Sequence, residues 1–319
     1  MKKSNIKLSI LVPSFNDSNY IEECLNSILK SNSFDFEIIV CDDCSDEDTL
    51  KIINKFNDSR LRVFESQERL GATDNYKRCL RKARGKWVHF LHSDDFYQDD
   101  SVDEILDALK SGDDVYLIKL KCFEDGNNKI FDIQCDEKSL KGIMNKDRSQ
   151  NSINLLKHFN HDELVLAIFP LEKFKLIKKL SKYSSHSSTM YWVLAIFHES
   201  NFSFINKGAV MKRYKHKVRR DQWGEIGNKK NVLGFSIRGF MGDLYNSFIL
   251  GTHSKNFFLL TKLLFGNRYN DNQIGGMYGV FKESSTYFFL GPVFQLILGP
   301  FLIFLKKSKI YVRFKKNTL

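Results

Sequence analysis

Two adjacent carboxylates, Asp94 and Asp95, follow an apolar run at residues 87–91 that has the composition of a buried strand. Such a pair repels itself unless a cationic partner lies close by, which can be a helix terminus, a basic side chain or a metal ion. Carboxylate oxygens are the hard ligands that Mg²⁺ and Mn²⁺ prefer. A helix that begins near Ser101 starts too far downstream for this pair to cap it, so the identity of the cationic partner stays open at this point.

Two further polar clusters follow apolar runs earlier in the chain. Residues 14–17, Ser-Phe-Asn-Asp, come after the first run, and Asp42 and Asp43 come after the second. The carboxyl ends of parallel strands meet at one edge of a sheet, and open α/β sheets bind their ligands there. One such cluster is typical of an ordinary polar loop, but the three together predict a ligand site at one sheet edge.

The elements that must position these clusters follow from hydrophobic periodicity. Strand patterns cover residues 6–12, 36–41, 61–64, 87–91 and 115–120. Helical patterns lie between them. The first is expected to start at a capping box formed by Asn19 and Glu22, the second follows Asp46 and Asp48, the third starts near residue 73, and the fourth starts at a second capping box formed by Ser101 and Glu104. This alternation predicts an α/β fold with a mostly parallel, doubly wound sheet and helices on both faces.

The pattern changes after residue 120. Residues 121–160 are polar and weakly periodic, which predicts a loop-rich excursion. Helical patterns return at residues 172–180 and 189–198, and short strands are expected at 202–205 and 209–214. From residue 231 the chain is Phe-rich and has a helical pattern. We therefore expect three parts, residues 1–120, 121–230 and 231–319, of which the last is a helical, hydrophobic appendage.

The charge is distributed unevenly. The chain of 319 residues carries a net charge of +11, yet residues 1–120 have 17 Lys and Arg against 23 Asp and Glu. The basic excess therefore lies in the second half, which is consistent with a solvated basic face, an anionic lipid surface or a phosphate-bearing substrate. No nucleic-acid-binding motif accompanies the charge, so we expect no nucleic-acid partner.

The cysteines indicate no disulfide or zinc framework. Cys41 and Cys44 form a C-x-x-C pair, but no second pair follows at zinc-finger spacing. A redox function is a weaker alternative for this pair, and the default is reduced thiols in a cytoplasmic protein.

An apolar segment lies near the C-terminus. The eighteen residues 288–305 contain no charged side chain. This length is at the lower limit for a membrane-spanning helix. Two Gly-Pro pairs interrupt the segment, and basic residues follow it. Burial in a globular core remains an alternative. We expect a broken hydrophobic element that docks on the inner face of the cell membrane without crossing it, with the neighbouring basic residues attracted to anionic lipid.

Taken in order, several stretches resemble glycosyltransferase family 2, the members of which have the GT-A fold. The opening strand and loop are LSILVPSFNDSNYIEECLNSIL, the second strand and acidic turn are FEIIVCDDCSDEDTL, and the approach to the acid pair is ERLGATDNYKRCLRKARGKWVHFLHSDDF. RYKH at 213–216 resembles a Tyr-Arg-x-His element of the family, with Lys215 displaced relative to the usual Arg. The strong similarity covers residues 6–110, about a third of the chain.

The resemblance implies an inverting enzyme that uses a divalent metal ion, Mn²⁺ or Mg²⁺. It would move a sugar from a nucleoside-diphosphate sugar to the hydroxyl group of a saccharide or lipid-linked acceptor, in the synthesis of a surface polysaccharide or a lipid-linked oligosaccharide. Residues 1–120 would then bind the nucleotide sugar, residues 121–230 the acceptor, and residues 231–319 the membrane.

The resemblance also assigns roles to single residues. Asp95 is the expected metal ligand, and Asp94 would contact the ribose or share the metal. His92 stands where the family usually has the first acid of a longer motif. His216 would reach the metal or the diphosphate.

For the nucleotide, Asp43 would accept a hydrogen bond from the base, while Asp42 fixes the turn. Phe15 would lie against the base, with simple packing as its alternative. The remaining expected nucleotide contacts are the loop residues Pro13, Ser14 and Asn16, and Asn75 on the third helix.

The general base is the least determined assignment. The family commonly has an acidic pair before a Trp-containing helix, but the residues that precede Trp192 at that spacing are Ser187 and Ser188. Because Ser is a poor base at neutral pH, His186 is the first candidate. Asp162 and Glu163 are the others. The missing pair leaves open a nucleotide-sugar-binding protein that has lost turnover. A sugar-nucleotidyltransferase is less favoured, since the first loop has no Gly-rich phosphate motif.

Overall fold

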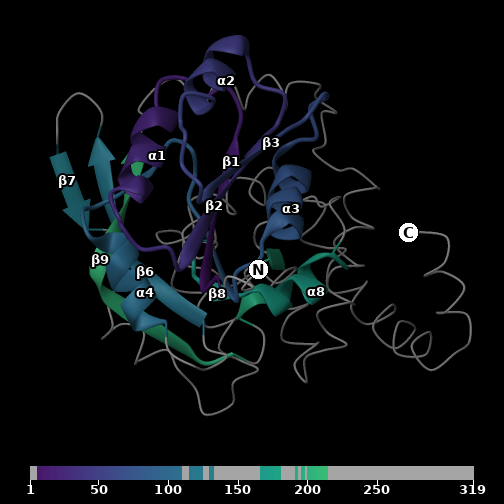
Figure 1. The fold of residues 1–319 in the computed structure, drawn as a ribbon. Coiled ribbons are helices and arrows are strands. Elements are labelled where there is room, and N and C mark those ends of the chain that lie inside the picture. Colours follow the sequence, from purple (N-terminus) through teal and green to yellow (C-terminus); the bar gives the residue numbers. More distant parts are fainter. Residues whose placement is uncertain are drawn as a thin grey trace, which may run out of the picture. The chain divides into compact units, whose positions relative to one another are not determined.

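A five-stranded sheet forms the centre of the computed structural model, which describes residues 6–109, 115–124, 129–132, 166–180, 191–192, 195–197 and 200–214 (Figure 1). The strand order is β3-β2-β1-β4-β8. The strands are β1 (Leu8–Ser14), β2 (Phe36–Asp42), β3 (Leu61–Glu65), β4 (Trp87–Phe90) and β8 (Phe169–Pro170). The first four are parallel and β8 is antiparallel to β4. Every residue of β1 and β2 is buried, as expected for parallel strands that are covered on both faces.

Helices cover the sheet on both sides, which confirms the predicted fold class. The helices are α1 (Ile21–Leu29), α2 (Glu47–Ile53), α3 (Ala72–Lys82), α4 (Ser101–Ala108), a short 3-10 turn η2 (Leu171–Lys173) and α8 (Phe174–Ile177). Figure 1 shows α1 and α3 on opposite sides of β1 and β2. Helix α1 buries Ile21, Cys24, Leu25 and Ile28, which are the positions that a period of 3.6 residues places on one face.

The helix starts were predicted only in part. The second helix follows Asp46 as expected, and the structure shows that Asp46 caps it, because its carboxylate accepts a hydrogen bond from the Thr49 N–H at 2.9 Å. The capping box at Asn19 was wrong, since the carbonyl of Asp17 receives the N–H groups of Tyr20 and Ile21 instead. The capping box at Ser101 was also wrong. Ser101 lies inside α4, and its hydroxyl donates to the Gln98 carbonyl.

The strand predicted at residues 115–120 belongs to a second sheet and not to the first. The order of this second sheet is β5-β9-β6-β7, with β5 (Phe96–Tyr97), β6 (Val115–Glu124), β7 (Lys129–Asp132) and β9 (Phe202–Tyr214). Strand β6 forms an antiparallel pair with β7 and a parallel pair with β9. The loop-rich excursion expected from residue 121 was therefore wrong for residues 121–124 and 129–132.

The two short strands expected at 202–205 and 209–214 are the halves of β9. Their pairing with β6 shifts register between Ile118, opposite Ile205, and Lys119, opposite Ala209. Gly208 has φ +70° at this irregularity. A bulge of this kind interrupts the alternation of side chains while backbone pairing continues, so the sequence pattern shows two strands.

The junction between the two sheets carries the acid pair. The chain leaves β4 at Phe90, passes through Asp94 and Asp95, and enters β5, which pairs with β9 through Phe96 and Tyr97. Both ends of this connection, residues 91–95, are thus anchored in a sheet.

The expected appendage at residues 231–319, with the apolar segment 288–305, lies outside the described residues. The division into parts at residues 120 and 230 stays a prediction. Within the part of the chain that the structure describes, no helix has the length and apolar character needed to cross a membrane.

Candidate functional site

The centre of the candidate site is a cluster formed by His92, Asp94 and Asp95. One potential ligand atom from each of the three lies within 4.8 Å of the others. Asp94 and Asp95 are buried, and the His92 side chain is 22% exposed. His92 Nδ1 lies 3.3 Å from Asp95 Oδ2, and the Asp95 N–H donates to the His92 carbonyl at 3.0 Å. This tight turn points three donor groups of the kind that bind Mn²⁺ at one place.

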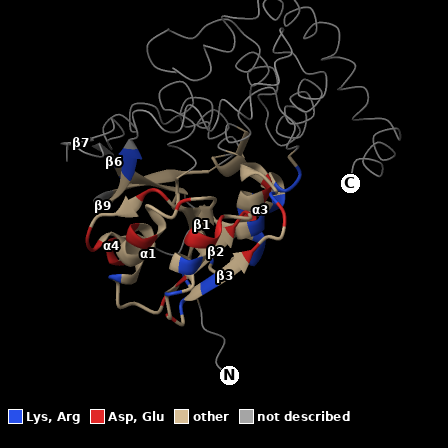
Figure 2. Cartoon of the chain, turned by 90° about the horizontal axis from the view of Figure 1, so that it is seen from above, with Lys and Arg blue, Asp and Glu red and all other residues tan. Residues whose placement is uncertain are grey.

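The surroundings of the cluster are negative. Asp17, at the end of the first loop, is buried there and accepts a hydrogen bond from the Ser93 hydroxyl. Burial, then the charges of Asp95, Asp94 and Asp17, raise the pKa of the Cys24 thiol well above its ordinary value. In Figure 2, parts of helices α1 and α4 are coloured red for Asp and Glu. The local field therefore favours a bound cation.

Arg213, at the end of β9, holds the acid pair from the second sheet. Its N–H donates to Asp95 Oδ1 at 2.9 Å, and its Nε donates to the Asp94 carbonyl at 3.0 Å. The guanidinium also pairs with Glu23, and its carbon lies 4.8 Å from the ring centroid of Tyr20. Arg213 thus fixes the backbone of the acid pair while its own charge is directed to Glu23.

The first loop is held by its own backbone and by the second loop. The Ser14 carbonyl accepts from the Asp43 N–H at 2.9 Å, while the Ser14 hydroxyl is buried without a hydrogen-bond partner among the described residues. Asn16 has φ 52°, and its side-chain oxygen accepts from the Asp46 N–H at 2.8 Å. Pro13 pairs with Cys41 within the sheet.

Phe15 is half-buried, and one of its faces carries a cation. The guanidinium carbon of the exposed Arg69 lies 3.8 Å from the Phe15 ring centroid, which is close stacking. A base that packs against Phe15 would share the ring with Arg69 or displace it. No local spacing predicts this contact, since 54 positions separate the two residues.

Asp42 and Asp43 accept hydrogen bonds from different parts of the chain. Asp42 accepts from the N–H of Ser45 at 2.9 Å and from its hydroxyl, which closes the turn. Asp43 accepts from the N–H groups of Leu70 at 2.7 Å and Gly71 at 2.9 Å. Each oxygen of Asp43 keeps a second lone pair, so a contact with a base stays a prediction.

Asn75 connects α3 to the end of β2. Its amide nitrogen donates to the Cys41 carbonyl at 2.8 Å, and its amide oxygen is buried without a hydrogen-bond partner among the described residues. The side chain is therefore buried, although it lies on a helix whose other polar residues are largely exposed or half-buried.

Other predicted residues lie outside the described part of the chain: His186, Asp162, Glu163 and His216. Trp192, predicted to follow the base, is buried, with its ring centroid 6.0 Å from that of Tyr76. The Tyr76 ring in turn lies 6.0 Å from His92.

Sequence reasoning did not assign a role to Arg213 or Asp17, and treated His92 only as a departure from the usual acid. The signal for His92 was its place three residues before Asp95. Another histidine, His89, takes no part in the cluster. Burial lowers its pKa to about 3, and its Nδ1 lies 2.5 Å from the Tyr97 hydroxyl. This imidazole is neutral at pH 7 and fastens β5 to β4.

The fold and the acidic cluster define a sugar-transferring enzyme of the GT-A type. The model of the family described as Glycosyl transferase family 2 matches residues 9–172, and the chain belongs to this family. The predicted family and enzyme class, a family 2 glycosyltransferase, are thus confirmed.

Two relatives illustrate the match. The UDP-Glc:alpha-D-GlcNAc-diphosphoundecaprenol beta-1,3-glucosyltransferase WfgD of Escherichia coli is 25% identical over 241 residues, which is 75% of this chain and 89% of WfgD. The poly(ribitol-phosphate) beta-N-acetylglucosaminyltransferase TarS of Staphylococcus aureus is 34% identical over 121 residues, which is 36% of this chain but only 21% of TarS.

Among solved structures, residues 1–349 of S. aureus TarS in complex with UDP-GlcNAc share the fold. The TM-score is 0.58 at 18% identity, over 81% of this chain and 70% of that structure.

Proposed function

We propose that this glycosyltransferase moves a sugar from a UDP-sugar to an acceptor hydroxyl with inversion at the anomeric carbon. One observation carries the proposal. Four side-chain atoms are buried at the carboxyl edge of β1, β2 and β4 without hydrogen-bond partners among the described residues: Ser14 Oγ, Asn75 Oδ1, His92 Nε2 and Asp95 Oδ2. Since each such atom costs roughly 1–3 kcal/mol, their concentration at one edge is typical of a site that a polar ligand completes. WfgD carries UDP-Glc in its name and TarS was solved with UDP-GlcNAc, which favours UDP as the nucleotide.

We further propose that His92, Asp94 and Asp95 hold a divalent cation, Mn²⁺ or Mg²⁺. The donor set fits, because two buried carboxylates and an imidazole converge, and His92 Nδ1 lies 3.3 Å from Asp95 Oδ2. When bound, the metal would supply positive charge to the leaving diphosphate. His216, the other predicted ligand, stays a prediction.

In the proposed reaction, the acceptor oxygen bonds to the anomeric carbon on the face opposite the diphosphate. The bond from that carbon to the diphosphate oxygen breaks, and the general base takes the proton of the acceptor hydroxyl. Arg213 and Asp17 keep the acidic cluster in place during this step. Asp43, Asn75, Phe15 and the loop residues Pro13, Ser14 and Asn16 orient the nucleotide.

The proposed acceptor is a saccharide, either lipid-linked or part of a surface polysaccharide. WfgD acts on a diphosphoundecaprenol-linked sugar, and TarS is named for poly(ribitol-phosphate). The basic second half of this chain suits an acceptor that carries phosphate. We propose that the protein works at the cytoplasmic face of the cell membrane, held there by residues 231–319.

The test is a donor screen. Isothermal calorimetry with UDP, GDP and dTDP, each with and without Mn²⁺, is expected to show tight binding of UDP only in the presence of the metal. Binding of UDP that is equally tight in a chelating buffer would contradict the metal assignment. No binding of any of the three nucleotides would overturn the proposed function.

The variant Asp43→Ala is expected to weaken UDP binding about tenfold, since the loops on both sides of the nucleotide lose their common anchor. Two backbone N–H groups, those of Leu70 and Gly71, also lose their partner. We therefore expect the free energy of unfolding to fall by about 2 kcal/mol and the melting temperature to fall with it. Calorimetry and thermal unfolding measure the two effects. Equal UDP affinity in variant and wild type would show that Asp43 serves the loop alone.

The variant Arg213→Met is expected to lower kcat about tenfold and to weaken Mn²⁺ binding, because the Asp94 carbonyl loses a charged donor. Arg60→Met is the matched control. Arg60 is similarly enclosed, pairs with Asp58 and lies over Phe36, but at the opposite end of β2. If both variants lower only the melting temperature, Arg213 has no role in positioning the acid pair.

A further inference from the structure

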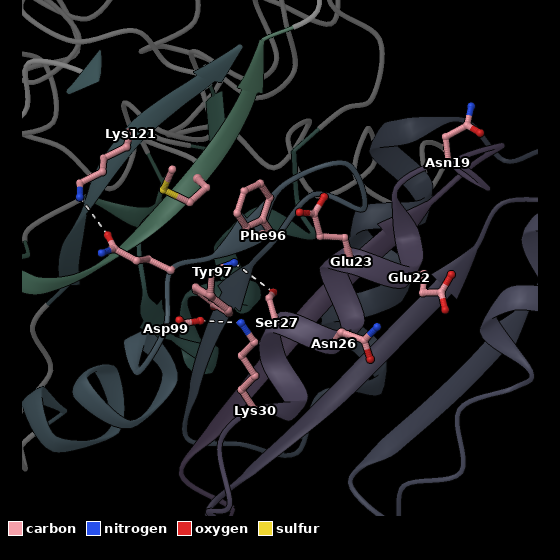
Figure 3. Close-up of a pocket in the computed structure, with 12 residues that line it drawn as sticks. Asn19, Glu22, Glu23, Asn26, Ser27, Lys30, Phe96, Tyr97, Asp99 and Lys121 are labelled. Carbon is pink, nitrogen blue, oxygen red and sulfur yellow. Dashed lines mark hydrogen bonds and ion pairs between the residues drawn. The ribbon is translucent and has the colours of Figure 1, made fainter. Parts of the chain in front are cut away.

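A groove of about 680 Å³ lies between helix α1 and strands β5, β6 and β9 (Figure 3). One wall consists of polar side chains, among them Glu22 and Asn26 of α1 and Asn19 of the turn before it. Phe96 of β5 and Met211 of β9 contribute the apolar part of the opposite wall. None of the nucleotide or metal residues discussed above lines this groove.

Of the charged side chains that line the groove, all but Glu22 have a polar or charged partner among the described residues. Lys30 bonds Asp99 at 2.5 Å, Lys121 donates to the Gln98 side chain at 2.9 Å, and Glu23 holds Arg213. Figure 3 shows the first two of these contacts across the groove. Because these charges are already compensated or engaged, the groove does not select a ligand of high net charge.

The groups that remain available are suited to hydroxyls. Asn19, Glu22 and Asn26 are exposed, and no hydrogen bond or ion pair joins their side chains to any other described residue. An Asn amide donates through its nitrogen and accepts through its oxygen, and the Glu22 carboxylate accepts through both of its oxygens, which matches the neighbouring hydroxyls of a pyranose. Phe96, next to Met211, offers an apolar surface for the C–H face of a sugar ring.

The groove is also connected to the acidic cluster. Phe96 directly follows Asp95 in the chain, and the guanidinium carbon of Arg213 lies 5.5 Å from the Phe96 ring centroid. Glu23 lines the groove and bonds the same Arg213 that donates to the Asp94 carbonyl. A ligand in the groove would thus lie against the outer side of the wall that holds the acid pair.

We propose that this groove binds an uncharged saccharide unit of the acceptor, at a distance from the hydroxyl that reacts. The proposal rests on the proposed glycosyl transfer for the identity of the ligand, but binding in the groove needs neither donor nor metal.

The test uses the full-length protein with ¹³C-labelled methionine methyl groups, and the Met211 signal is assigned with Met211→Leu. The probes are the methyl glycosides of glucose, N-acetylglucosamine, galactose and mannose, with glycerol as a control polyol. At least one glycoside is expected to shift the Met211 signal saturably while glycerol does not. Glu22→Gln and Asn26→Ala are expected to weaken that binding three- to tenfold, the size of one lost hydrogen bond. Glu47→Gln, at an exposed Glu in the first turn of α2, should leave it unchanged.

If no glycoside shifts the Met211 signal up to its solubility limit, or if Glu22→Gln and Glu47→Gln behave alike, the groove is not a saccharide site. UDP binding measured on the same samples separates this outcome from failure of the proposed function. If UDP still binds but no glycoside shifts the Met211 signal, only the proposed saccharide site is overturned.

Discussion

Asp95→Asn is expected to lower the rate of sugar transfer at least about 100-fold while the fold stays intact. The substitution keeps the shape of the side chain and an oxygen that can still accept from the Arg213 N–H. It removes the negative charge and the buried Oδ2 that has no hydrogen-bond partner among the described residues. Losing one preorganised electrostatic contact to a developing charge commonly costs 100- to 1,000-fold in turnover. Kinetics with a UDP-sugar and a matched Mn²⁺ titration measure the effect.

The control is Asp107→Asn, which makes the same chemical change at an exposed position of α4. It should leave both turnover and Mn²⁺ binding unchanged. In wild type, removal of divalent ions with a chelator should abolish transfer, and added Mn²⁺ should restore it. Full activity of Asp95→Asn, or of wild type in chelating buffer, would contradict the assignment of Asp95 as a metal ligand.

The four parallel strands of the first sheet were predictable because they appear as short continuous apolar runs, and β1, β2 and β4 are fully buried. Residues 36–41 and 61–64 were each placed to within one residue of β2 and β3. Backbone features were not predictable in the same way. The carbonyl of Asp17 replaces a side-chain cap at α1, and the bulge at Gly208 breaks the alternation of β9 into two apparent strands.

The candidate site was likewise predictable only in part. The acid pair and the two polar loops follow directly from strand ends, so the sequence was sufficient to bring them to one edge. Contacts made by residues far apart in the chain were not predictable. Arg213 is 118 positions from Asp95, and Asp43 is 27 from Leu70. No periodicity or local spacing relates such residues, since the packing of β9 against β5 creates the first contact.

The histidines of the described chain narrow the search for the general base. His89 is fully buried and bonded to Tyr97, and its pKa is lowered to about 3 by burial, so it cannot take a proton near neutrality. His92 belongs to the proposed metal cluster. His186, six positions before Trp192, therefore stays our first candidate, with Asp162 and Glu163 as the alternatives.

His186→Ala is expected to lower kcat at least about 100-fold with little change in UDP affinity, the size that loss of a positioned base commonly produces. An imidazole base with an ordinary pKa of about 6.5 places the acid limb of the pH profile of kcat near that pH, because turnover falls as the base becomes protonated. A carboxylate base would instead move the limb to about pH 4. His198→Ala, at the next histidine along the chain, serves as the control and should leave the profile unchanged. If Asp162→Asn or Glu163→Gln lowers kcat and His186→Ala does not, and the acid limb lies near pH 4, the base is that carboxylate and not His186.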